Sequence, residues 1–69
     1  MRNTNLHLTP IEVDIMKLVA DGLDNVAISK VLYISRHTVK AHLTAAYKKL
    51  EARNRANAVY KAMKCEYIS

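Results

Sequence analysis

The sequence predicts an all-α fold, a bundle of four helices. The 69 residues include one Gly and one Pro and are 51% hydrophobic, a composition that suits compact helices joined by short turns better than a turn-rich sheet. Four segments also begin at a residue suited to cap a helix and carry apolar side chains at helical spacing. A chain of this length forms one small domain and leaves little room for a substrate cavity.

The first helix is predicted over residues 10–21. Thr9 is a suitable N-cap, Pro10 fits the first helical position, and Glu12 stands three residues after the cap, as in a capping box. Gly22 can adopt the left-handed conformation that ends a helix. A second role for Glu12, as ion-pair partner to a basic residue of the last helix, is an open alternative. The expected core stripe consists of Ile15, Met16, Val19 and Ala20.

A second and a third helix are predicted close together in the chain. The second covers residues 25–32 behind the N-cap Asp24. The third covers residues 36–50 behind the N-cap Ser35, so only residues 33–35 remain as a turn. Two short helices joined by so tight a turn form a helix-turn-helix. In that motif the first helix crosses the DNA backbone and the second lies in the major groove.

The third helix has two distinct faces. At about 100° per residue, one arc is apolar and another is basic or small. The apolar arc is expected to pack against the core, which leaves the other arc free to bind a ligand. The apolar arc holds Val39, Leu43, Ala46 and Leu50, and the free arc holds His37, Lys40, Ala41, Thr44 and Lys48.

The fourth helix is predicted over residues 55–64, behind the N-cap Asn54. After it comes a tail in which no cap holds Tyr67 or Ile68. The predicted organisation is an N-terminal arm over residues 1–7, a domain over residues 8–64 and a tail over residues 65–69. The inward face of the fourth helix is expected to hold Ala58, Val59 and Ala62, with Asn57, Tyr60 and Met63 to the side or outward.

The positive charge lies in the second half of the chain. Three Lys or Arg accompany four Asp or Glu in residues 1–34, whereas eight accompany two in residues 35–69. With a net charge of +5, this asymmetry is the electrostatic footprint expected of a nucleic-acid binder, although a solvated basic face is a common alternative explanation.

Other function classes find no support in the sequence. It has no apolar run long enough to cross a bilayer and no signal-peptide pattern, so a cytoplasmic protein is expected. Cys65 is alone, and with His7, His37 and His42 it shows no zinc-ligand spacing, so we expect no metal, cofactor or small-molecule ligand. No acid pair, Ser/His/Asp set or Gly-rich phosphate loop indicates an enzyme.

Several short motifs follow one another in a characteristic order. They are Leu8-Thr9-Pro10, Glu12 and Gly22, then Asn25-Val26-Ala27-Ile28, then Ile34-Ser35-x-x-Thr38-Val39-Lys40-x-His42, then Lys49-Leu50 and Asn54-Arg55-x-x-Ala58-Val59. With them the chain resembles the LuxR-type (GerE, NarL) helix-turn-helix DNA-binding domain of bacterial transcription regulators, over residues 8 to about 63. The resemblance implies a sequence-specific transcription regulator whose partner is double-stranded DNA.

The resemblance assigns the free arc of the third helix to DNA. Lys40, Ala41 and Thr44 take the positions that face base edges in the family. Thr38 and His42 match residues that contact phosphate or hold the helix in place, and a local bond for Thr38 or packing for His42 are open alternatives. The residues expected to contact the DNA backbone are Asn25, Ser35, Arg36, His37, Thr38, His42, Lys48 and Lys49.

In the resembling family the last helix mediates dimerisation. One helix in one major groove reads only a few base pairs, so a homodimer on two half-sites is expected. Repulsion between lysines and a small apolar area predict weak association without DNA. That Tyr60 only covers the helix edge is an open alternative. The expected interface residues are Asn57, Tyr60, Lys61 and Lys64.

Two departures from the family pattern bear on packing. Glu51 stands where the family has Gly, so either it adopts a left-handed conformation at a cost of about 1 kcal/mol or the helix ends differently. Ala46 and Ala52 replace larger aliphatic residues, which predicts a thinner core or an inward Tyr47.

A third departure suggests an alternative function. Ile11 and Val13 replace residues that are usually charged in the family, and exposed apolar side chains there indicate a protein partner. The alternative is a protein-interaction module of the same fold, which pairs with another regulator or with RNA polymerase. An exposed Tyr60 also favours it.

Overall fold

The computed structural model describes residues 7–68, in which all regular structure is helical. The helices are α1 (Pro10–Ala20), α2 (Asn25–Leu32), α3 (Arg36–Leu50) and α4 (Arg55–Lys64). The predicted all-α fold is confirmed, and the helix bounds agree except that α1 ends at Ala20 rather than Asp21. The predicted arm over residues 1–7 lies outside the described residues apart from His7.

Each helix begins at the predicted cap. Thr9 Oγ1 accepts from the Glu12 amide at 3.3 Å, and Glu12 Oε1 accepts from the Thr9 amide at 2.8 Å, so the capping box is present. The side chains of Asp24, Ser35 and Asn54 each accept from a first-turn amide of α2, α3 and α4. These bonds satisfy donors that a helix start otherwise leaves unpaired.

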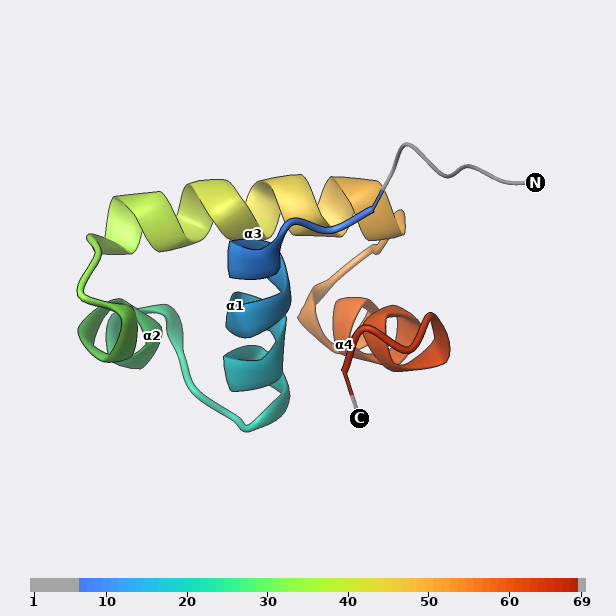
Figure 1. Ribbon diagram of the computed structural model, residues 1–69, viewed down its shortest axis with the longest axis horizontal. Helices are drawn as coiled ribbons and strands as arrows, with labels where there is room; N and C mark the ends of the chain where they lie inside the picture. Colours follow the sequence, from blue (N-terminus) through green and yellow to red (C-terminus); the bar gives the residue numbers. More distant parts are fainter. Residues whose placement is uncertain (1–6, 69) are drawn as a thin grey trace.

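The longest helix organises the bundle. In Figure 1, α3 runs along one side of the molecule and α1 stands crosswise beneath it, with α2 near one end of α3 and α4 near the other. α3 contacts each of the other helices. The apolar face of α3 therefore supplies much of the core. The core residues are Leu8, Ile15, Met16, Val19, Ile28, Val39, Leu43, Ala46, Leu50, Ala58, Ala62 and Ile68.

Some packing expectations are corrected. Ala20, expected in the core stripe of α1, is exposed. Ile11 and Val13, expected as exposed apolar residues, are half-buried and pack against the core. Tyr47 is half-buried against the same core, as expected if it compensates for Ala46 and Ala52.

Residues 65–68, predicted as a tail in which no cap holds Tyr67 or Ile68, pack against the rest of the domain. Ile68 is only 6% exposed, and Tyr67 Oη accepts from the Leu8 amide at 3.3 Å. Glu66, at φ 65°, reverses the chain after α4, and the Tyr67 amide then donates to the Ala62 carbonyl at 2.9 Å. This reversal brings Tyr67 beside the residues that precede α1 and Ile68 beside residues at the end of α1.

Left-handed residues end the helices, and most of them are not glycine. Gly22 follows α1, whereas Tyr33, Glu51 and Glu66 adopt positive φ angles of 58°, 56° and 65° after α2, α3 and α4. The left-handed alternative predicted for Glu51 is thus confirmed. A side chain in this conformation costs about 1 kcal/mol relative to glycine. Lys61 Nζ, which donates to the Glu51 carbonyl at 2.7 Å, holds the turn in place.

We expect Glu51→Gly to raise the free energy of unfolding by about 0.5 to 1 kcal/mol, because glycine relieves the left-handed strain while the Lys61 bond uses only the backbone carbonyl. Urea denaturation measures the change. Glu51→Ala is the matched control, since it removes the carboxylate but keeps Cβ, and it should give little gain. Equal stabilisation by Gly and Ala would assign the effect to charge rather than to the backbone.

Glu12 carries an ion pair, and its partner is in α3 rather than in the last helix. Lys49 Nζ lies 2.8 Å from Glu12 Oε1, and the Glu12 side chain is 5% exposed. Burial alone would raise the pKa of Glu12. The hydrogen bond from Lys49, the bonds from Thr9 and the Lys49 charge outweigh burial and hold this pKa below its ordinary value. The pair joins the first turn of α1 to the last turn of α3.

Candidate nucleic-acid interface

The two faces predicted for α3 are both present. The apolar residues of the first face are buried, from Val39 to Leu50. On the second face every side chain of the predicted free arc is exposed, and Arg36 is exposed beside it. α3 therefore presents a basic surface to the outside along several turns. The free arc holds His37, Lys40, Ala41, Thr44 and Lys48.

The start of α3 is held by two hydroxyls. Ser35 Oγ accepts from the Thr38 amide at 3.0 Å and donates to Thr38 Oγ1 at 2.9 Å. Thr38 is half-buried, so the local bond considered for it is present. A phosphate oxygen accepts hydrogen bonds, so a contact needs an O–H that can donate; Ser35 already donates its O–H to Thr38, whereas the Thr38 O–H can still donate. A phosphate contact by either residue stays a prediction.

An open groove separates the beginnings of α2 and α3. Asn25 and Val26 line it from α2. From the α3 side it is lined by the cap Ser35 and by the exposed side chains of Arg36, His37 and Lys40. The charged side chains in this lining are both positive, and no carboxylate shares it. The start of each helix also directs unpaired backbone amides outward, which favours an anion.

Arg55 is a structural residue that the sequence reasoning missed. From the first turn of α4 its guanidinium donates to Asn25 Oδ1 at 3.2 Å and to the Leu23 carbonyl. The bonds tie α4 to the beginning of α2 and so help to set where the groove lies. They also occupy the side-chain oxygen of Asn25, so a DNA contact by Asn25 would use its amide NH₂ group.

The two lysines near the end of α3 are not equivalent. Lys48 is exposed, and its ammonium forms no hydrogen bond or ion pair within residues 7–68. Lys49 is half-buried, and its ammonium is bound to Glu12. His42 is also half-buried, at the edge of the apolar face, consistent with the packing alternative.

The outer face of α4 carries exposed apolar surface. Tyr60 is 57% exposed and Met63 is 51% exposed, and the Lys64 ammonium lies 5.9 Å from the centre of the Tyr60 ring. The other expected interface residues are engaged within the chain: Asn57 Oδ1 accepts from the Arg53 amide, and Lys61 donates to the Glu51 carbonyl. Met63 therefore belongs with Tyr60 on this face, although it was not among the expected interface residues.

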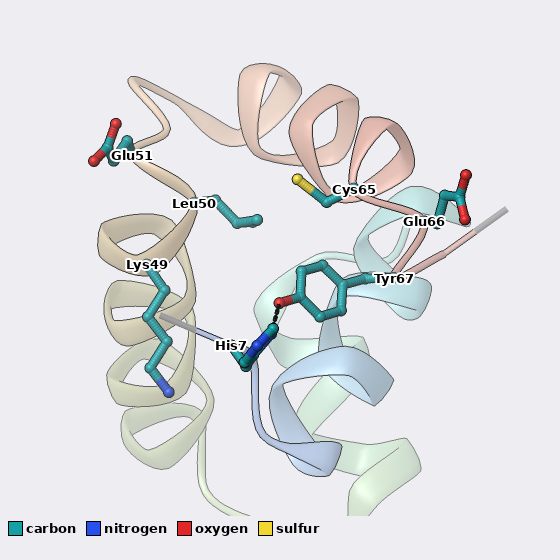
Figure 2. Close-up of a pocket in the computed structure, with 7 residues that line it drawn as sticks. All are labelled: His7, Lys49, Leu50, Glu51, Cys65, Glu66 and Tyr67. Atoms are coloured by element: carbon teal, nitrogen blue, oxygen red, sulfur yellow. Dashed lines mark hydrogen bonds between the residues drawn. The ribbon is translucent and has the colours of Figure 1, made fainter. Parts of the chain in front are cut away.

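A second open groove lies at the other end of α3 and was not predicted. Figure 2 shows His7 and the Tyr67 ring meeting across it, where His7 Nδ1 lies 3.1 Å from Tyr67 Oη. Its lining mixes both signs of charge with an exposed thiol, and the free arc of α3 does not contribute to it. The lining residues are His7, Lys49, Leu50, Glu51, Cys65, Glu66 and Tyr67.

Within residues 7–68 no three His, Cys, Asp or Glu side chains come close enough together to hold a metal ion. In the same part of the chain no helix has the length and apolar character needed to cross a membrane.

The fold and the exposed face of α3 define a helix-turn-helix protein, and comparison with known proteins gives the family. The profile of bacterial regulatory proteins of the luxR family, GerE, matches residues 6–62. This chain therefore belongs to the LuxR family of bacterial regulatory proteins, a family of transcription regulators and not of enzymes. The resemblance read from the sequence is thereby confirmed.

Several curated proteins are similar to this chain. The nitrate/nitrite response regulator NarL of Escherichia coli K12 is 45% identical over 51 residues, which are 74% of this chain and 24% of NarL. The quorum sensing-dependent transcriptional regulator RpaR of Rhodopseudomonas palustris is 46% identical over 56 residues, 81% of this chain and 23% of RpaR. The transcriptional regulatory protein YdfI of Bacillus subtilis 168 is also 46% identical over 56 residues, 81% of this chain and 26% of YdfI.

The matches cover only a small part of each relative. The chain spans between 6% and 26% of the length of the curated relatives it matches. No solved structure gives a significant match.

Proposed function

We propose that this chain binds duplex DNA sequence-specifically, with the free arc of α3 in the major groove, and that it regulates transcription from the bound site in the bacterial cytoplasm. The observation that carries the proposal is the exposed basic arc of α3, opposite a fully packed apolar face. An α-helix fits the width of the major groove. Positive side chains on that helix are attracted to the phosphates on either side of the groove. Membership of the LuxR family supports the same function.

Within this proposal the free arc divides into base and backbone contacts. Lys40 is a long, charged side chain in the first half of α3 and can donate to the acceptor edge of guanine. Ala41 and Thr44 are small, so they let the helix backbone approach the base edges. Arg36, beside the start of the arc, and Lys48, at its end, are exposed and are placed to contact phosphates.

The residues proposed to contact the DNA backbone are not equally free to do so. Lys48 is free to reach a phosphate, whereas Lys49 would have to leave Glu12 to do so. Ser35, Thr38 and Asn25 already serve helix caps and the Arg55 bridge. We therefore assign the larger share of backbone binding to Arg36, His37 and Lys48, with Ser35, Thr38, Asn25 and His42 as weaker contacts that position the helix.

The test begins with selection of binding sequences from random duplexes. Lys40→Ala is then expected to weaken binding to the selected duplex by about 1 to 3 kcal/mol and to relax the preference at one base pair, because a bidentate base contact is lost. Lys48→Ala is the matched control on the same arc. It should weaken all sequences about equally and lower the dependence of affinity on salt.

If Lys40→Ala leaves the sequence preference unchanged, Lys40 is not one of the residues that contact base edges. Selection that recovers no preferred sequence, together with no salt-dependent binding of duplex DNA, would overturn the proposed function as a whole. Fluorescence anisotropy with labelled duplexes measures both affinity and salt dependence.

We further propose that two copies meet on DNA through the outer face of α4. The exposed side chains of Tyr60 and Met63 supply apolar surface for a two-fold contact. Lys64 keeps its charge near the Tyr60 ring, and repulsion between two such lysines keeps the contact weak until DNA aligns the copies. Asn57 and Lys61 contribute to the contact indirectly, because their hydrogen bonds to Arg53 and Glu51 hold the turn between α3 and α4 in place.

The alternative of a protein-interaction module loses its main support. It rested on exposed Ile11 and Val13, and both side chains pack against the core. The exposed Tyr60 remains, but a homodimer contact accounts for it. We therefore do not assign a separate protein partner to α1.

A further inference from the structure

One side chain of the free arc differs in kind from its neighbours, because it can change its charge near neutral pH. His37 is exposed in the first turn of α3, and no hydrogen bond within residues 7–68 involves its ring. It stands seven residues before Thr44, so the two side chains share nearly the same direction, within about 20° around the helix axis. His37 therefore lies at the centre of the arc proposed to face DNA.

The surroundings of His37 contain positive charge and no acid. The groove that it lines is shared with Arg36 and Lys40 of α3 and with the uncharged Asn25 and Val26 of α2. The carboxylate nearest in sequence on the α2 side is Asp24, and it is turned to the Ala27 amide at 2.9 Å as the cap of α2. α1 and α4 contribute no side chain to this groove. No partner in the described protein is therefore positioned to hold an imidazolium charge.

We propose that His37 contacts DNA as the imidazolium, so that binding takes up a proton from solvent. This inference rests on the proposed function. Histidine is the side chain whose charge changes most readily between about pH 5 and about pH 8. Moving His37 from a cationic groove to the surface of a polyanion favours the charged form, which can donate to a phosphate oxygen or to the acceptor edge of a base. DNA then binds the protonated protein more tightly.

The sign of the pH effect follows from this linkage. Affinity for duplex DNA should fall as pH rises, and uptake of at most one proton per chain limits the change to about tenfold per pH unit. Proton uptake by His37 on binding is expected over only part of the range from about pH 6 to about pH 8. We therefore expect the dissociation constant for duplex DNA to increase about three- to tenfold across that range. Lysine and arginine do not change charge in this range.

The experiment measures anisotropy of the duplex recovered by selection, at constant ionic strength across this pH range. His37→Gln should bind with little pH dependence, at or below the affinity of the parent chain at the higher pH. His37→Lys carries a fixed charge and should bind without pH dependence, near the affinity of the parent chain at the lower pH. His7→Gln is the matched control, because His7 lies outside the proposed DNA contacts and bonds to Tyr67, and this variant should keep the full pH dependence.

The outcomes separate this inference from the proposed function. Tight, specific binding that is independent of pH in the parent chain would overturn the role of His37 and leave the proposed function intact. The same holds if His37→Gln keeps the pH dependence, or if His7→Gln loses it. Circular dichroism at each pH confirms that the variants stay folded.

A comparison of sequences identifies the atom that His37 contacts. If His37→Gln weakens the selected and a shuffled duplex by the same factor at the lower pH, the acceptor is a phosphate. If it weakens the selected duplex alone and relaxes one base pair, the acceptor is a base edge. Both results support a protonated contact, whereas an unchanged affinity at the lower pH would overturn it.

Discussion

Replacement of Glu12 by Gln is expected to lower the free energy of unfolding by about 1 to 2 kcal/mol near neutral pH. Glutamine can still accept from the Thr9 amide, so the capping box is kept and only the charge of the pair with Lys49 is lost. Removing one partner of a fully buried pair costs about 3 to 5 kcal/mol. The Lys49 side chain is 27% exposed and can turn to water, so a smaller loss is expected here.

The loss should depend on pH in a defined direction. The pKa of Glu12 lies below its ordinary value of 4.5 in the folded protein, so its charge stabilises the fold at pH values above that ordinary value. This stabilisation is lost as pH falls through the folded pKa. The difference in stability between the parent chain and Glu12→Gln should therefore shrink as pH falls below 4.5 and approach zero once the pH is below the pKa of Glu12 in the folded protein.

Two lysine variants provide the controls. Lys49→Met removes the same ion pair from the α3 side and should destabilise the protein near neutral pH. Lys48→Met changes the adjacent, exposed lysine and should have little effect. Urea denaturation at several pH values measures all of these changes. A stability difference for Glu12→Gln that stays constant into acid would mean that the ion pair does not stabilise the fold.

This pair matters because the core is small. A single core in a chain of this size rarely supplies more than about 3 to 5 kcal/mol, and several core positions on α3 and α4 are occupied by alanine. The Glu12–Lys49 pair fixes the end of α3 against the start of α1. It therefore helps to hold the free arc of α3 in one orientation, although neither side chain belongs to that arc.

The helices could be predicted from the sequence because local chemistry determines them. Thr9, Asp24, Ser35 and Asn54 each bond to an amide only three residues away, so their capping role is visible in the sequence. The two faces of α3 follow from helical periodicity alone. The left-handed Glu51 is one of the two expected alternatives, because Glu51 stands where the resembling family has Gly.

The remaining features depend on contacts between distant residues. The bonds from Lys49 to Glu12 and from Arg55 to Asn25 and Leu23 join positions that are 30 or more residues apart. Helical periodicity places Lys48 and not Lys49 on the free arc, but no local pattern identifies Glu12 as the partner of Lys49. The tail was missed for the same reason, because Ile68 is buried only once Glu66 has reversed the chain.

A Tyr60→Asp variant is expected to lose cooperative binding to a paired site while it still binds a single half-site at the weak level of the parent chain. Tyr60 is exposed beside Met63, away from the free arc of α3, so a carboxylate there leaves the DNA-facing side chains unchanged. Placed at a two-fold contact, two carboxylates would be buried against each other and against apolar surface, which is costly. The affinity for the paired site should fall by about tenfold or more, toward that of one half-site.

Mobility-shift titrations on duplexes with one and with two half-sites measure both quantities. Tyr60→Phe is the matched control, since it keeps the ring and the apolar area and should keep cooperativity. If Tyr60 only covers the edge of α4, Tyr60→Asp will bind the paired site as the parent chain does. The next surface to test would then be the exposed apolar residues Val31 and Tyr33, which are 51% and 94% exposed. Ile11 and Val13 are weaker candidates, because the core already holds their side chains.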